Sequence, residues 1–235
     1  MGIKEGLSLV IQRTRERERE RLVPLCDDGP AAEPGRWTIK DTLAHLTAWR
    51  VHAAAIINAA RSDGKAPDPI DDINQENAAI YAASKDLRAA AVVEAAEESW
   101  RTLNAAIEAC SEQVLRSPRP GRAEQLVWET VPGNAHAHLA EHLGYLAEEG
   151  GDERAAEAEA RWAHNLDTEA FPEPRQRANA DYNLACYFAR RGRLNDALPL
   201  LRQAFSLNPD LKSWAQKDKD LDPVRSSAEL AGMLG

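Results

Sequence analysis

Apolar residues recur at helical spacing along most of the chain, and segments rich in glycine and proline separate these helical stretches. The charged run from Arg13 to Arg21 interrupts the first stretch, and we interpret it as a solvated helix face. A capping pattern at Thr38 and Asp41 predicts the amino end of the second helix. The pattern thus predicts long helices over residues 3–26, 38–61, 87–115 and 134–150, with a short crossing helix over 73–83. Four long helices in this order predict a helical bundle.

The pattern changes after Gly150-Gly151, where shorter helices follow one another at repeat-like spacing. The first is expected over 152–167. From Ala178 onward, small and large packing residues fall where a tetratricopeptide repeat places them, at Tyr182, Leu184, Ala185, Phe188, Gly192, Ala197, Leu201, Ala204 and Pro209. Residues 218–225 resemble the closing segment that follows a terminal repeat. We therefore expect two domains, 1–149 and 152–235, the second a short helical hairpin extension similar to tetratricopeptide repeats.

Composition supports an all-α fold, because alanine and leucine dominate the apolar residues and β-branched runs are few. The formal net charge is −9 and the pI is near 5.3. This acidic balance disfavours binding to phosphate backbones or to anionic lipid, so a nucleic-acid partner is not expected.

Cysteine usage and the amino-terminal pattern indicate the compartment. Cys26, Cys110 and Cys186 lie far apart and form no paired-cysteine motif, so we expect reduced, buried thiols. The chain start has no apolar core of signal-peptide length, and no long uncharged apolar run occurs. We therefore expect a cytoplasmic protein with no membrane partner.

Two histidines of the fourth predicted helix carry the clearest chemical signal. His138 and His142 are four residues apart, so their side chains lie on one helix face, at the spacing by which two imidazoles share a metal ion. His136 lies about 200° from His138 around the helix and is expected to face elsewhere. No glycine-rich phosphate loop, nucleophile elbow or paired-cysteine zinc motif occurs.

Several segments along residues 1–149 carry a family resemblance. They are Trp37 to Trp49, Ile73-Asn74, Lys85-Asp86-Leu87, Trp128-Glu129, Gly133-Asn134 and His138 to His142. In this order and spacing the chain resembles the DinB-like four-helix superfamily and, within it, the ClbS/DfsB branch. The resemblance implies a bundle of four long helices with a small-molecule cavity between the second and the fourth.

The resemblance also implies chemistry for the histidines. Some DinB-like relatives bind a divalent metal through three histidines or transfer low-molecular-weight thiols, and the ClbS branch includes a self-protection enzyme that hydrolytically opens a cyclopropane electrophile. Carried over by motif, the candidate ligands are His45, His138 and His142. Metal- and thiol-handling relatives commonly follow the last histidine with Arg-Gly-Gln, whereas this chain has Leu143-Gly144-Tyr145, which favours the ClbS/DfsB branch. There the histidines can instead orient water, donate protons or satisfy buried hydrogen bonds.

Other polar and aromatic residues complete the candidate site. His142, His138 and Glu141 are the expected catalytic residues, with water activated by either histidine and Glu141 a conceivable general base. Asn134 lies one turn before His138 and is alternatively a helix cap, while core packing is the expected role of Trp37 and Trp100. The expected substrate-binding residues are Trp49, Trp128, Asn134, Tyr145 and Asn74.

Three hypotheses follow for the function. The first is a ClbS/DfsB-type protein that binds a small electrophilic or stress-related compound, or detoxifies it by hydrolysis. The second is a metal-dependent hydrolase or thiol transferase that uses the three histidines and one zinc, nickel or manganese ion. The third is a non-catalytic adaptor, whose repeat-like segment binds a protein partner or a second copy of the chain.

Overall fold

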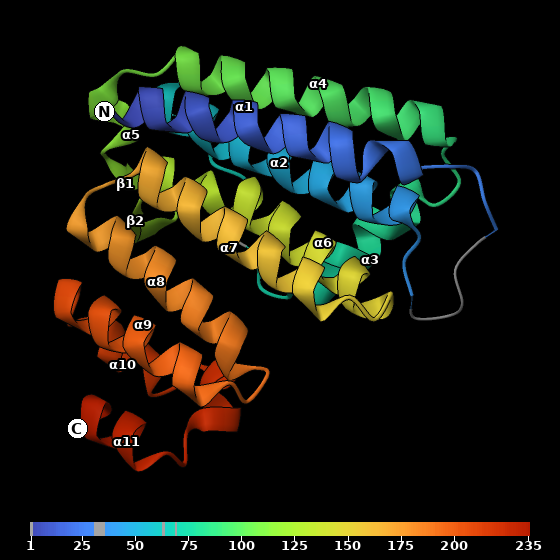
Figure 1. Cartoon of the computed structure of the whole chain (residues 1–235). Helices are drawn as coiled ribbons and strands as arrows, with labels where there is room; N and C mark the ends of the chain where they lie inside the picture. The colour runs from blue at the N-terminus through green and yellow to red at the C-terminus, as the bar shows by residue number, and fades with distance from the viewer. Residues whose placement is uncertain (1, 31–35, 63, 69) are drawn as a thin grey trace. The chain divides into compact units, whose positions relative to one another are not determined.

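The computed structural model describes residues 2–30, 36–62, 64–68 and 70–235. Within this part of the chain the regular elements are helices, apart from one two-stranded hairpin, which confirms the all-α prediction (Figure 1). The chain divides into two compact units, Met1–Leu146 and Ala147–Gly235, and the boundary between them falls within helix α6. Between the first two predicted helices, most of the glycine- and proline-rich segment 29–35 lies outside the described residues.

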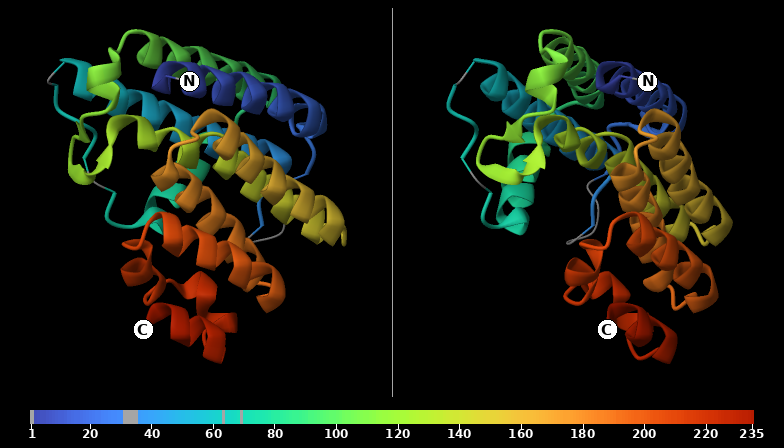
Figure 2. Two further views of the ribbon diagram at one scale, coloured as in Figure 1. Left: turned by 60° about the vertical axis from the view of Figure 1, so that its left-hand side comes forward. Right: turned by 90° about the vertical axis from the view of Figure 1, so that its left-hand side faces the viewer.

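The amino-terminal unit is built on four helices in the predicted order, α1, α2, α4 and α6, and shorter elements connect them. α1, α2 and α4 run side by side in every view (Figures 1 and 2). The bounds are α1 Ile3–Arg21, η1 Val23–Leu25, α2 Ile39–Ser62, α3 Ile73–Ser84, α4 Ala89–Glu108, α5 Glu112–Leu115, β1 Pro118–Arg119, β2 Arg122–Leu126, η2 Val127–Thr130, η3 Pro132–Asn134 and α6 His136–Glu149.

The predicted helix over 87–115 is wrong in its extent, because the structure divides it. α4 ends at Glu108, and Ser111 begins the short helix α5 by accepting a hydrogen bond from the Val114 amide at 3.2 Å. A serine side chain that caps a new helix competes with continuation of the old one. Apolar spacing alone does not reveal such a break.

Apolar side chains from α2, α4 and α6 form one core cluster of this unit. Leu43 and Leu46 of α2 and Leu139 of α6 are at most 1% exposed. Burial of each such side chain contributes about 1.5–3 kcal/mol. The cluster comprises Leu22, Leu43, Ala44, Leu46, Val92, Ala96, Leu139 and Leu143. It is this packing that fixes α2 and α6, the two helices that carry the histidines.

The interpretation of 13–21 as a solvated face is wrong at two positions, because Thr14 and Glu18 are both buried. Glu18 is 2% exposed and forms an ion pair with Arg50 of α2, with Oε2 and Nη1 2.7 Å apart. The Trp100 indole of α4 donates to the same carboxylate at 2.8 Å, and Arg50 also donates to Ser99 at 2.8 Å. Three helices of the bundle therefore meet at a buried ion pair whose charged groups are hydrogen-bonded.

The hairpin β1–β2 was not predicted from the sequence. The two strands pair antiparallel, and Gly121 between them has a φ of 78°. This left-handed conformation favours glycine, which explains why Pro120-Gly121 marks a turn and not simply the end of a helix. Strands this short carry too little alternation to be recognised by pattern.

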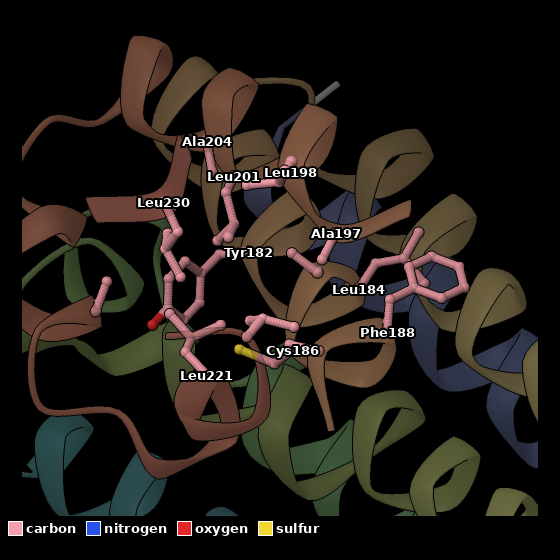
Figure 3. Close-up of a cluster of buried hydrophobic side chains, with 14 of the residues drawn as sticks. Tyr182, Leu184, Cys186, Phe188, Ala197, Leu198, Leu201, Ala204, Leu221 and Leu230 are labelled. Carbon is pink, nitrogen blue, oxygen red and sulfur yellow. The ribbon is translucent and has the colours of Figure 1, made fainter. Parts of the chain in front are cut away.

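The carboxy-terminal unit consists mainly of short helices. Helices α8 and α9 pack as a pair, and fully buried Ala185, Ala197 and Ala204 lie where close approach requires small side chains. Figure 3 shows Leu201, Leu221 and Leu230 directed into the same cluster. The bounds are α7 Glu153–Ala170, α8 Pro174–Ala189, α9 Leu194–Leu207, α10 Leu211–Ala215, η4 Lys219–Val224 and α11 Ala228–Leu234.

Hydrogen bonds hold the closing segment on this helix pair. The Tyr182 hydroxyl of α8 donates to the Asp218 carboxylate at 2.8 Å, and Asp218 also caps η4 by accepting from the Asp220 amide at 3.0 Å. Arg225 donates to the carbonyl oxygens of Ala215 and Gln216 at 3.1 and 3.0 Å. The packing is that of a helical hairpin with a capping segment, and its identity as a tetratricopeptide repeat stays a prediction.

Two expectations concern the chain as a whole. No described helix combines the length and the apolar character that crossing a bilayer requires. The cysteines form no disulfide with one another, and Cys110 and Cys186 are buried as expected, whereas Cys26 is half-buried.

Candidate metal centre

Three histidines from two helices meet inside the amino-terminal unit. His45 lies near the start of α2, and His138 and His142 lie one turn apart on α6. Nε2 of His138 is 2.9 Å from Nε2 of His45 and 3.3 Å from Nε2 of His142. The ligand atoms of the three residues all lie within 4.8 Å of one another. Packing of α2 against α6 thus brings together residues that are 93 positions apart in sequence.

Burial keeps these imidazoles neutral. Desolvation lowers the pKa of His138 to about 2, and the charges of His142, His45 and Arg50 act in the same direction. Burial, followed by the charge of His142, lowers the pKa of His45 to about 4. Burial also lowers the pKa of His142, opposed by the nearby Glu141. At neutral pH the cluster therefore offers neutral imidazoles, the form in which histidine binds a metal.

The spacing of the nitrogen atoms fits a shared cation. Two nitrogen ligands at about 2.0–2.1 Å from one ion stand about 2.9 Å apart at a right angle and about 3.4 Å apart at a tetrahedral angle. The two measured separations from His138, 2.9 and 3.3 Å, fall within this range. Imidazole suits zinc, copper, iron and nickel. His45, His138 and His142 therefore fit a divalent transition metal and leave further coordination positions open.

The outer side of the cluster differs from well-supported metal sites. Ligating histidines usually donate their second ring N–H to a carboxylate or a carbonyl, which orients the ring and strengthens the ligand. Here Nδ1 of His45 and Nδ1 of His138 are buried and have no hydrogen-bond partner among the described residues. The ligand nitrogens converge, while the rings are held by packing and not by hydrogen bonds at Nδ1.

Aromatic rings surround the three histidines. Trp37 lies 4.6 Å from the ring of His45 and stacks on His142 at 6.2 Å, with an angle of 15° between the planes. Tyr145 meets His142 edge-on at 6.1 Å, and Trp49 meets His45 at 6.2 Å. Tyr145 is 45% exposed, so part of this aromatic rim faces solvent. A small molecule that reaches the histidines there contacts apolar ring faces.

The structure places the other predicted site residues at different distances from this centre. Trp49 borders it directly. Glu141 and Tyr145 are exposed and joined by a hydrogen bond of 2.7 Å. Trp128 is 2% exposed within η2. The side-chain amide of Asn134 donates to the Thr130 carbonyl at 2.7 Å. This hydrogen bond holds Asn134 on the preceding turn, and Asn134 is the last residue of η3. Its side chain therefore does not cap α6, the alternative role expected for it.

The crossing helix α3 contributes a different asparagine from the one predicted. Asn74 is exposed in the first turn of α3, where its backbone N–H donates to the Asp72 side chain at 2.8 Å. Asn77, one turn later, accepts a hydrogen bond of 3.2 Å from the Trp49 indole. Asn77 thereby orients a ring that contacts His45.

Sequence reasoning missed Trp37 and Asn77 as parts of the site. Core packing is the expected role of Trp37, but Trp37 is only partly buried and contacts the rings of His45 and His142. The position of Trp37 directly before the cap residue Thr38 could have indicated a place in the site, because the turns of α2 that follow carry His45. His136 is fully buried at the start of α6, and it is not part of the three-histidine group.

Together, the bundle and the converging nitrogens define a helical protein with a three-histidine site able to hold a divalent metal ion. A family model described as the DinB superfamily matches residues 11–146, which is more than half of the chain. The protein belongs to the DinB superfamily. Searches of curated proteins and of solved structures gave no match.

Proposed function

We propose that the amino-terminal unit is a metal-dependent hydrolase of a small electrophilic molecule, with His45, His138 and His142 as the metal ligands. The observation that carries the proposal is the convergence of three neutral imidazoles, in which Nε2 of His138 is 2.9 Å from Nε2 of His45 and 3.3 Å from Nε2 of His142. The DinB superfamily includes metal-dependent hydrolases, which supports the same reaction class. A bound divalent ion lowers the pKa of water and polarises an electrophilic centre.

The lowered pKa values argue for this role and against metal-free general base catalysis by the histidines. A general base works best when its pKa lies near the working pH. The pKa values of His138 and His45, about 2 and about 4, lie far below neutrality, so these groups hold a proton poorly. The ClbS/DfsB type of reaction, hydrolytic detoxification with water activated by the histidines alone, is therefore the less favoured form of the proposal.

The remaining residues of the site position the substrate and limit water. Trp37 and Trp49 present ring faces beside the ligand histidines, and Asn77 fixes the Trp49 indole. Tyr145 and the exposed Glu141 lie on the solvent side of His142. In this arrangement Glu141 is the acidic group best placed to accept a proton close to the ligand histidines.

Isotope labelling separates hydrolysis from thiol transfer. Zinc-loaded protein is offered a panel of epoxides, strained rings and esters in H₂¹⁸O, with and without a low-molecular-weight thiol, and the products are weighed by mass spectrometry. The proposal predicts a product that carries ¹⁸O, lost in His142→Ala and retained in His164→Ala, which changes a histidine of α7 in the carboxy-terminal unit. A thiol adduct without ¹⁸O identifies a transferase instead. Equal product from His142→Ala refutes the role of the cluster.

A further inference from the structure

One of the arginines near the hairpin β1–β2 lacks the acidic partner that its neighbours have. Arg116 is 3.6 Å from Glu112, and Arg122 is 3.6 Å from Glu124. Arg119 has no carboxylate at ion-pair distance among the described residues. Its Nη1 donates to the neutral amide of Gln125 at 2.8 Å, and its Nε is buried without a hydrogen-bond partner.

Such a cation is costly unless something balances it. Arg119 is half-buried, and desolvation lowers its pKa, as does the charge of Arg122, while Glu124 opposes them. An arginine in a protein keeps its charge even when desolvated, so it needs a counter-charge or hydrogen-bond acceptors. Glu124 lies on the same strand as Arg122 and is held by it. Among the described residues, no carboxylate therefore forms an ion pair with the Arg119 guanidinium.

A row of rings along one face of α2 leads from the Arg119 region to the three histidines. His45, Trp49 and His52 are spaced at helical intervals, and the ring centroids are separated by 6.2 and 5.6 Å. The charge of Arg119 lowers the pKa of His52, as burial does more strongly, and Glu76 opposes this. The seven-residue separation of His45 and His52 corresponds to about 10 Å along the helix.

We propose that Arg119, together with His52, binds the anionic group of a small molecule, a carboxylate or a phosphate. Arginine presents a planar fork of donors that matches either group, and a neutral imidazole adds one more donor. The rest of the molecule lies along Trp49, so that its other end reaches the three-histidine centre. The placement of the other end of the molecule at the three histidines rests on the proposed function. Binding of the anionic group by Arg119 does not, because it requires no metal.

Matched probes test the site in the full-length, metal-free chain. The probes are 3-phenylpropionate, phenyl phosphate and the neutral 3-phenylpropionamide, each titrated while the arginine Nε–Hε resonances are followed by NMR. The variants are Arg119→Gln and, as the matched control, Arg122→Gln, whose arginine already has a carboxylate partner.

The expected result is saturable binding of at least one anionic probe, with a shift of the Arg119 resonance. Arg119→Gln weakens this binding about tenfold or more, whereas Arg122→Gln changes it little. The amide probe binds more weakly than the carboxylate to the wild type and equally to both variants. Preference for phenyl phosphate or for 3-phenylpropionate identifies which anion the fork accepts.

Two results overturn the proposal. One is the absence of saturable binding by either anion, and the other is equal binding to the wild type and Arg119→Gln. A folding defect does not obscure the test, because removal of an unbalanced cation is expected to leave the melting temperature unchanged or raised. Since no metal is present, failure here leaves the proposed hydrolase untouched, and failure of the hydrolase leaves the anion site standing.

Discussion

Two buried polar clusters lie in the same bundle, and they are completed to different degrees. At the Glu18–Arg50 pair, the guanidinium donates to the carboxylate, to Ser99 and to Thr47, and the Trp100 indole donates to the carboxylate. At the three-histidine cluster, nitrogen atoms face one another, and Nδ1 of His45 and His138 has no partner among the described residues.

The difference separates a structural role from a binding role. A buried network whose members are satisfied by one another fixes the relative positions of helices and needs no ligand. Nε2 atoms that meet only one another form at most one hydrogen bond per pair, according to the tautomer, and a shared cation can replace these contacts with metal–nitrogen bonds. The ion pair therefore stabilises the arrangement of the helices, whereas the three histidines are the proposed metal-binding group.

The largest predicted effect comes from breaking the ion pair on one side. Glu18→Gln leaves the Arg50 charge buried without its carboxylate, so the free energy of unfolding falls by about 3–5 kcal/mol. Urea denaturation followed by circular dichroism measures it. The control Glu16→Gln changes an exposed residue of the same helix and is expected to stay within about 0.5 kcal/mol. Equal effects of the two variants contradict a structural role for the pair.

Metal binding is expected to stabilise only a chain with an intact cluster. At a free zinc concentration of one hundred times Kd, the wild type gains about 2.7 kcal/mol of unfolding free energy over the metal-free protein. His138→Ala removes the Nε2 atom that lies close to Nε2 of both His45 and His142. We expect zinc to give this variant no increase in unfolding free energy. Thermal melts with and without a chelator measure it. A gain that persists in His138→Ala would place the metal elsewhere.

Acid is expected to destabilise the metal-free protein through the same histidines. Their pKa values are lower in the folded chain, so the unfolded chain binds more protons once the pH falls below about 6.5. Stability is therefore unaffected above that pH, and it falls as the pH drops toward the pKa of His45, about 4. The expected loss between pH 7 and 4.5 is about 2–3 kcal/mol for each of His45 and His138, measured by urea melts. The double variant His45→Leu/His138→Leu should show a flatter profile, and an unchanged profile refutes the assignment.

The smallest predicted effect lies at the exposed rim. Tyr145→Phe removes the hydroxyl that donates to Glu141 at 2.7 Å, and both residues are solvent-exposed. The unfolding free energy is expected to change by less than about 0.5 kcal/mol, since water replaces an exposed hydrogen bond. Metal affinity should not change either. Isothermal titration with zinc checks this, and a large loss of affinity would show that the rim supports the ligands.

The helices and the pairing of His138 with His142 could be predicted from local pattern. Apolar spacing gave the order of the long helices, and the four-residue separation placed both imidazoles on one face. The third histidine, His45, came from resemblance, because its distance from His138 is set by packing of α2 on α6. The local sequence around His45 or His138 does not predict that contact.

What could not be predicted depends on tertiary partners. Glu18 looks like its exposed neighbours in the charged run, and the Arg50 side chain of α2 and the Trp100 indole of α4 account for its burial. Asn77 and Asn74 are both asparagines of α3, and the position of the Trp49 indole alone distinguishes them. In each case hydrogen bonds from another helix determine the role of the residue, and composition and periodicity do not predict them.

The central claim is tested most directly by the metal content of untagged protein purified without chelator. Wild type, His138→Ala and the control His52→Ala are measured by elemental analysis, before and after incubation with zinc, nickel or manganese and desalting. We expect about one ion per chain in the wild type and in His52→Ala, and none in His138→Ala. No metal in the wild type after loading, or equal metal in His138→Ala, would contradict it.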